Sequence, residues 1–180
     1  MFGALGRNGI NIRAIAQGSS EKNISTVIAT HDVSKAINVL HEEFFETTIK
    51  HVNLFITGTG NVGSKLLNQL HQQAATLKKQ LNLDIQVAGL SNSRKMIFKN
   101  EGIDLSNWKE ALDKGSDASI SKFVNEAIAR NLRNSIFVDV TANKDVAALY
   151  EKLLKKSIAV VACNKIAASS EYKNYKYLKE

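Results

Sequence analysis

The residues with the clearest chemical potential are three glycines within six positions, in the run Gly58-Thr59-Gly60-Asn61-Val62-Gly63. The run follows an apolar segment at 52–57 and opens an amphipathic one at 61–79. In that setting the first glycine makes a tight turn, the second lets a phosphate approach the backbone, and the third lets helix and strand pack closely. The free N–H groups of the first helical turn, including those of Asn61 and Val62, favour an anion. The pattern predicts a dinucleotide site, with a glycine turn that binds nothing as the alternative.

A second set of polar groups follows the next apolar segment, residues 85–90. A site that selects NAD usually has an aspartate or glutamate here, which holds the ribose hydroxyls of the adenosine. This chain has Ser91, Asn92 and Arg94 at that point, and no acid. The planar guanidinium of Arg94 matches a phosphate, so the pattern favours NADP, with NAD as the alternative. The other interpretation is a solvated turn with surface cations.

Two later apolar segments end in residues that could act on a substrate. Thr141 and Ala142 follow residues 135–140, and Lys165 follows residues 158–163. Ligands bind outside the carboxyl ends of the strands in an open α/β sheet, so these residues could face the cofactor. Thr141 could instead cap the next helix. Lys165 could be a proton carrier, a substrate clamp or a solvated surface cation.

The elements that must position these groups alternate between strand and helix from residue 49 onward. Apolar runs of strand length stand at 52–57, 85–90, 135–140 and 158–163, and helical periodicity is found at 61–79, 121–131 and 144–155. Such alternation is typical of a parallel sheet with right-handed crossovers. The sequence therefore predicts an α/β fold over residues 49–180, with a doubly wound parallel sheet of the Rossmann type.

Residues 1–48 have a different pattern, with a short helix, two strands and a second helix in succession. A helix closed by Asn8-Gly9 opens the segment, because glycine tolerates the left-handed conformation that ends helices. Residues 10–16 alternate like a half-buried strand, a turn is expected at 17–20, and residues 23–30 form a second strand. We predict a partial α+β unit whose open strand edges favour a homo-oligomer.

Composition argues against several classes of protein. The 180 residues carry 24 Lys and Arg against 17 Asp and Glu, and the net charge of +7 is spread along the chain. A diffuse charge of this kind predicts no nucleic-acid partner. The apolar stretches are shorter than the roughly 18 residues that span a bilayer, so no membrane partner is expected. The four histidines lack the spacing of a metal site, and the single cysteine, Cys163, fits a reducing, cytoplasmic compartment.

The chain resembles the central part of bifunctional aspartate kinase/homoserine dehydrogenases. Residues 11–21, together with Ile24-Ser25, resemble the second ACT regulatory repeat of those enzymes. Residues 56–63 resemble the glycine loop of their dehydrogenase portion, and residues 138–141 followed by 160–165 resemble its later strand ends. The likeness runs over nearly all of the chain in the same order, so it is far more specific than the glycine motif alone.

The resemblance implies a function. The dehydrogenase of this family interconverts L-aspartate 4-semialdehyde and L-homoserine with NAD(P)H, on the route to threonine and methionine. Lys165 matches a lysine that serves in catalysis or proton transfer, and it lies near the nicotinamide and a small amino-acid substrate. Thr141 and Ala142 match positions beside the nicotinamide ribose. Asn11 and Gln17 match the ACT region, which senses an end-product amino acid such as threonine in many members.

The resemblance also sets limits on what this chain can do alone. Cys163 stands where the family often has proline, which changes the local backbone. A kinase domain would lie before Met1, and the last cofactor-domain strand and the homoserine site would follow Glu180. We therefore expect a C-terminally truncated NAD(P)-binding domain at 49–180 and a partial ACT segment at 1–48, a fragment that binds cofactor without turnover. The alternative is a non-catalytic ACT and nucleotide-sensing module that regulates a partner.

Overall fold

The computed structural model describes residues 1–18, 23–45 and 49–179. The chain divides into two compact units, Met1–Thr48 and Ile49–Glu180. Among the described residues, no helix has both the length and the apolar character needed to cross a membrane.

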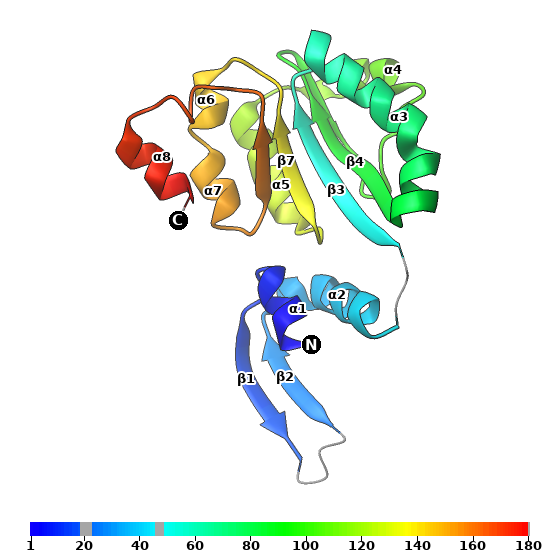
Figure 1. The fold of residues 1–180 in the computed structure, drawn as a ribbon, viewed down its shortest axis with the longest axis vertical. Helices are drawn as coiled ribbons and strands as arrows, with labels where there is room; N and C mark the ends of the chain where they lie inside the picture. The colour runs from blue at the N-terminus through cyan, green and yellow to red at the C-terminus, as the bar shows by residue number, and fades with distance from the viewer. Residues whose placement is uncertain (19–22, 46–48, 180) are drawn as a thin grey trace. The chain divides into compact units, whose positions relative to one another are not determined.

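The first unit pairs a two-stranded ribbon with two helices (Figure 1). Its elements are α1 (Phe2–Arg7), β1 (Ile12–Gln17), β2 (Ile24–Ile28), a 3₁₀ turn η1 (Thr30–Asp32) and α2 (Val33–Phe45). The helix end predicted at Asn8-Gly9 is confirmed, since Gly9 has a left-handed φ of 70°. The two strands are antiparallel, with Gln17 opposite Ile24. Residues 19 and 20 of the predicted turn lie outside the described residues.

The core of the first unit is small. Its buried members are Ala4, Leu5, Ile10, Ala36 and Val39. The strand predicted at 10–16 is present as β1, but its predicted half-burial is wrong, because every residue from Arg13 to Gln17 is exposed. The ribbon of β1 and β2 extends beyond the two helices, so its outer part has no layer to pack against (Figure 1).

The second unit is a six-stranded sheet with helices on both faces. Its elements are β3 (Lys50–Thr57), α3 (Asn61–Leu81), β4 (Leu83–Ser91), β5 (Lys95–Phe98), α4 (Trp108–Asp113), β6 (Ser116–Asp117), α5 (Ile120–Arg130), β7 (Ser135–Asp139), α6 (Lys144–Ala147), α7 (Tyr150–Leu154), β8 (Ala159–Ala162) and α8 (Tyr172–Lys179). The strand order is β6-β5-β4-β3-β7-β8. The four strands β4, β3, β7 and β8 are parallel. β5 pairs antiparallel with β4, and β6 pairs antiparallel with β5.

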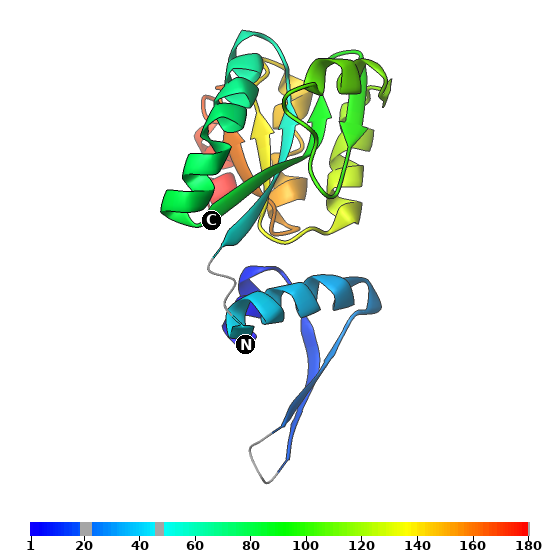
Figure 2. The same ribbon diagram turned by 90° about the vertical axis from the view of Figure 1, so that its right-hand side faces the viewer.

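The central strands are buried on both faces, which explains their continuous apolar sequences. Helix α3 covers one face of the sheet and α5 covers the other (Figure 2). Successive residues of β3 alternate between these layers. Leu54 and Ile56 pack in the cluster that contains Leu67 of α3, whereas Phe55 packs in the cluster that contains Phe123 of α5.

The topology confirms the predicted α/β sheet and creates a switch point. From β3 the chain passes through α3 to β4 on one side, and the next parallel strand, β7, lies on the other side of β3. The carboxyl ends of β3 and β7 are level, with Thr57 opposite Asp139. Ligands of open α/β sheets bind outside such a point. The glycine run and Thr141 follow these two strand ends, so the fold places them at one edge.

Candidate functional site

Two glycines of the run at 58–63 are required by the chain itself. Gly58 has a positive φ of 96°, and a Cβ there would lie 2.8 Å from the carbonyl oxygen of Val140. A Cβ on Gly63 would lie 2.0 Å from the carbonyl oxygen of Gly58. Both positions therefore exclude a side chain, because the end of β3, the start of α3 and the end of β7 are in close contact.

Gly60 is different, because nothing in the chain requires it to be glycine. It is the N-cap of α3 with φ −70°, and a Cβ there would have no atom within 4 Å. No side chain caps α3, and its first turn carries no acid. The site thus offers open space beside the N–H groups and positive dipole end of a 21-residue helix. This arrangement fits an approaching phosphate.

The turn after β4 is tied to the glycine loop. Ser91 is buried, its hydroxyl donates to Thr57 Oγ1 at 3.1 Å, and its carbonyl accepts the N–H of Gly58 at 2.8 Å. The Asn92 Oδ1 accepts the backbone N–H groups of Arg94 and Lys95, both at 2.7 Å. Asn92 therefore shapes a tight turn between β4 and β5. The side chain of Arg94 is exposed beyond this turn.

The carboxyl end of β7 holds a buried acid that the sequence analysis did not single out. Asp139 has no exposed surface. Its Oδ2 accepts the hydroxyl of Tyr150 at 2.5 Å and the Nδ2 of Asn164 at 3.0 Å, and its Oδ1 accepts the N–H of Thr141 at 2.8 Å. The available signal was an acid inside the apolar run at 135–140, since buried aspartates are rare unless they are paired.

The loops after β7 and β8 lie side by side at the same edge. The backbone N–H of Cys163 donates to the carbonyl of Asp139 at 2.8 Å, and Asn164 Nδ2 donates to the carbonyl of Asn143 at 2.9 Å. Lys165 is exposed immediately after Asn164. The structure therefore brings the loop that carries Thr141 and Ala142 next to the loop that carries Lys165.

A groove lies between α3 and the sheet, next to the glycine loop. It has a volume of about 550 Å³ and is lined by Asn61 and Val62 at the start of α3 and by Val140 and Cys163 at the strand ends. Most of its other lining residues are aliphatic side chains of the sheet, among them Leu54, Ile136, Val138 and Val161. The predicted cofactor residues at 58–63, 91–94 and 141–142 follow the carboxyl ends of β3, β4 and β7, which are level, so they belong to one edge of the sheet. Within the described residues, no group of three or more His, Cys, Asp or Glu side chains could hold a metal ion.

Comparison with known protein families agrees with this geometry. Residues 58–180 match the family described as homoserine dehydrogenase, NAD binding domain. The chain belongs to that family. Residues 1–44 match an ACT domain. These matches confirm the family resemblance, and they support a nicotinamide dinucleotide as the cofactor.

Individual relatives are bifunctional enzymes whose names include homoserine dehydrogenase. Bifunctional aspartokinase/homoserine dehydrogenase 2, chloroplastic, of Arabidopsis thaliana is 40% identical over 100% of this chain and 20% of that protein. The bifunctional aspartokinase/homoserine dehydrogenase of Buchnera aphidicola is 34% identical over 100% of this chain and 22% of that protein. The chain therefore spans about a fifth of the length of the curated relatives it matches.

A solved homoserine dehydrogenase supports the fold. The enzyme of Thermoplasma acidophilum aligns with a TM-score of 0.55 and 22% identity, over 72% of this chain and 40% of that one. The family's dinucleotide fold therefore accounts for the sheet of the second unit.

The two residues predicted to bind an effector in the ACT unit are not brought together. Asn11 precedes β1 and Gln17 ends it, and both are exposed. A strand rises by about 3.3 Å per residue, so the two positions are separated by about 20 Å. A ligand the size of one amino acid does not contact both in a single copy of the ribbon.

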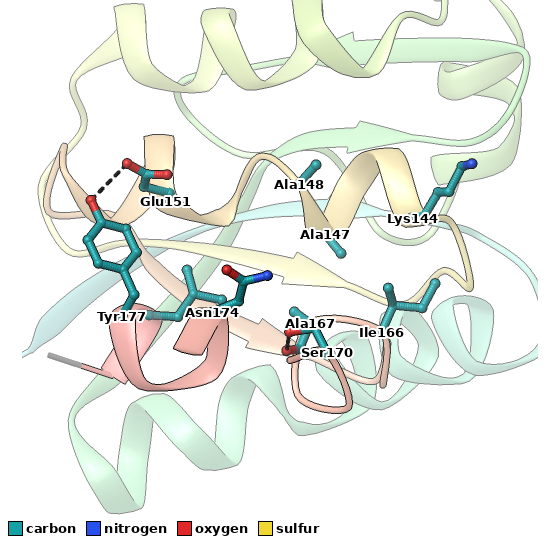
Figure 3. Close-up of a pocket in the computed structure, with 10 residues that line it drawn as sticks. Lys144, Ala147, Ala148, Glu151, Ile166, Ala167, Ser170, Asn174 and Tyr177 are labelled. Carbon is teal, nitrogen blue, oxygen red and sulfur yellow. Dashed lines mark hydrogen bonds between the residues drawn. The ribbon is translucent and has the colours of Figure 1, made fainter. Parts of the chain in front are cut away.

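A second pocket lies away from the glycine loop, between α6, α7 and α8 (Figure 3). Its volume is about 270 Å³. The hydroxyl of Tyr177 donates to Glu151 at 2.9 Å, and Lys155 pairs with the same carboxylate at 2.5 Å, so these charged groups neutralise each other. None of the predicted cofactor or catalytic residues lines this pocket.

The ionisation of Tyr150 should make the stability of the second unit depend on pH. Burial, and then the hydrogen bond to the Asp139 carboxylate, raise the pKa of the Tyr150 hydroxyl far above its ordinary value of 10.0. The unfolded chain loses this proton first, so the stability that the hydroxyl contributes is present below about pH 10 and is lost as the pH rises further.

We expect the tyrosinate absorbance of Tyr150 to appear only when alkali unfolds the second unit. Ultraviolet titration with parallel circular dichroism measures this, and Tyr150→Phe should remove the step that coincides with unfolding. A tyrosinate signal from Tyr150 in the folded protein would contradict the expected pKa.

Proposed function

We propose that this chain supplies the cofactor-binding half of a homoserine dehydrogenase, which interconverts L-aspartate 4-semialdehyde and L-homoserine with NAD(P)H. The observation that carries the proposal is Gly60, whose missing side chain has no role within the chain and leaves open space at a free helix N-terminus. The family match and the bifunctional relatives support the choice of substrate. In the proposed organisation residues 1–48 are a partial ACT regulatory segment and residues 49–180 are the cofactor domain.

The residues have separate roles in this proposal. The N–H groups at 60–63 bind the pyrophosphate, and the turn at Ser91–Arg94 holds the adenosine ribose. Thr141 and Ala142 lie beside the nicotinamide ribose. The bound cofactor supplies the hydride for the aldehyde carbon. Lys165 stabilises the negative charge that develops on the aldehyde oxygen and delivers the proton that completes the alcohol.

The adenosine end of the site favours NADP over NAD in our proposal. Asn92 fixes the turn, no acid stands at the end of β4, and the guanidinium of Arg94 is exposed beyond the turn. A guanidinium can bind a phosphate through two parallel hydrogen bonds. An acid in place of Arg94 would instead suit the free ribose hydroxyls of NAD.

Arg94→Ala should weaken NADPH by about 10- to 100-fold and change NADH by less than about twofold, because a charged hydrogen bond contributes about 1.5–3 kcal/mol. Side-by-side titrations of NADPH and NADH by fluorescence or calorimetry measure this. Lys95→Ala is the matched control, since it removes a cation of the same turn that already pairs with Asp117 at 2.9 Å. Equal losses of affinity for both nucleotides would show that Arg94 does not bind the 2′-phosphate. Binding of neither nucleotide by the native chain would overturn the proposed function.

Regulation and assembly complete the proposal. The ACT unit binds an end-product amino acid such as threonine, with Asn11 and Gln17 contacting it from different copies of the unit. A homo-oligomer is proposed because the two-stranded ribbon has exposed apolar side chains, including Ile15 and Val27, that a neighbouring copy would cover. A cytoplasmic location is proposed because the single Cys163 is free and suits a reducing compartment.

A further inference from the structure

A buried carboxylate links three elements at the catalytic edge of the sheet. Asp139 ends β7, Tyr150 begins α7, and Asn164 follows β8. A buried charge is expensive unless hydrogen bonds satisfy it, and here the donors come from a tyrosine, an amide side chain and a backbone N–H. All three side chains are buried, and their polar atoms bond to one another and to neighbouring backbone. Their arrangement therefore needs an explanation other than contact with the cofactor's pyrophosphate.

The carboxylate fixes the start of each neighbouring loop. Its Oδ1 accepts the N–H of Thr141, the second residue of the loop expected beside the nicotinamide. Its Oδ2 holds the side chain of Asn164, which is 5% exposed and directly precedes Lys165. One carboxyl group thus joins the two segments that carry the predicted nicotinamide and catalytic residues.

Asn164 also fixes the backbone on both sides of Lys165 through further hydrogen bonds. Its Nδ2 donates a second bond to the carbonyl of Asn143 at 2.9 Å, and its Oδ1 accepts the N–H of Ile166 at 3.1 Å. The carbonyl of Lys165 itself accepts the N–H of Ser169 at 2.8 Å. The backbone at residue 165 is therefore held on both sides while its side chain remains exposed.

We propose that Asp139, Tyr150 and Asn164 are positioning residues that hold Thr141 and Lys165 at the nicotinamide end of the site. This inference rests on the proposed function for the roles of Thr141 and Lys165. Tyr150 acts as a permanent donor, because its raised pKa keeps the hydroxyl protonated wherever the protein is folded. The cluster should not affect binding of the adenosine end of the cofactor, which depends on the turn at 91–94.

That separation gives a test with two ligands and one variant. NADPH contains the nicotinamide, whereas adenosine 2′,5′-bisphosphate contains only the adenosine end. Asn164→Ala should raise the dissociation constant of NADPH about tenfold or more, because it also releases the loop of Thr141 and Ala142, which Asn164 holds through the carbonyl of Asn143. The dissociation constant of the bisphosphate should change by less than about twofold.

Two further measurements separate positioning from general stability. Hydrogen exchange of the amides at 163–169 should become about tenfold faster or more in Asn164→Ala, while the amides of β3 and β4 keep their protection. Asn53→Ala is the matched control. Asn53 is also buried, and its Nδ2 donates to the carbonyl of Arg133 at 2.8 Å, but it lies toward the amino-terminal ends of β3 and β7. The control should leave the exchange at 163–169 and the ratio of the two affinities unchanged.

A double exchange of the partners tests the specific contact. In Asp139→Asn with Asn164→Asp, the amide at 139 donates to the carboxylate at 164, and that carboxylate still accepts the N–H of Ile166. The bond to the carbonyl of Asn143 is lost, because a carboxylate cannot donate, so the recovery should be partial. The pair should recover at least part of the NADPH affinity and of the exchange protection that either single variant loses. Tyr150→Phe should give a smaller change in the same direction, and it carries the test if Asn164→Ala does not fold.

Unchanged exchange at 163–169 in the folded variants would overturn the positioning role, as would equal losses for both ligands. Native protein that binds neither ligand would instead contradict the proposed function, and the exchange data alone would then decide whether the cluster fixes residue 165.

Discussion

Replacing Lys165 with alanine is expected to lower the turnover of the active enzyme by about two to four orders of magnitude, the range that a positioned proton donor contributes. The dissociation constant of NADPH should change by less than about threefold, because the phosphates bind at residues 58–63. Lys165 is exposed, and its neighbours rather than its own side chain fix the loop, so the variant should fold normally. The measurements are homoserine-dependent reduction of NADP⁺, NADPH titration and a thermal melt.

The control for this prediction is another lysine of the same region. Lys144 is exposed at the start of α6, one residue after Asn143, and it lines the pocket between α6, α7 and α8 rather than the groove beside the glycine loop. Lys144→Ala should therefore leave turnover within about twofold, since surface changes away from a site have small effects. Normal turnover in Lys165→Ala would remove Lys165 from the mechanism. An equal loss in both variants would show that general charge, and not position, matters.

The sequence predicted the parts of the fold that depend on local pattern. Strands β3, β4, β7 and β8 are continuous apolar runs because both faces of the sheet are covered, and such runs are easily recognised. The short strand β5 was missed because its four residues, Lys95–Phe98, are too few to show a strand periodicity. The helix predicted at 144–155 is two short helices, with a turn in which the N–H of Leu149 donates to the carbonyl of Val146.

The candidate site was predictable only where its chemistry is local in sequence. The glycine run could be interpreted because the strand before it and the helix after it are its direct neighbours in the sequence. Asp139 was missed because its partners, Tyr150 and Asn164, stand 11 and 25 residues away. Only the parallel pairing of β7 with β8 and the return of α7 bring these groups together, and neither register nor crossover geometry can be obtained from composition or periodicity.

The glycine loop offers the sharpest distinction between binding and stability. Gly60→Ala places a methyl group in open space at an ordinary φ, so the folded chain should lose only about 1 kcal/mol of unfolding free energy, through a poorer N-cap. The same methyl group would occupy the path by which the pyrophosphate reaches the backbone. We therefore expect NADPH affinity to fall by about 100-fold or more, because the phosphate contacts with the helix N-terminus are then lost.

Gly63→Ala is the matched variant with the opposite expectation. Its methyl group would lie 2.0 Å from the carbonyl oxygen of Gly58, so α3 must move away from the end of β3. Overpacking of this kind destabilises proteins by about 1–3 kcal/mol or more. Chemical denaturation and NADPH titration of both variants should show a stable protein with weak binding for Gly60→Ala and a clearly destabilised one for Gly63→Ala. Native affinity in Gly60→Ala would mean that no phosphate approaches residue 60, and the glycine would then be no more than part of a turn.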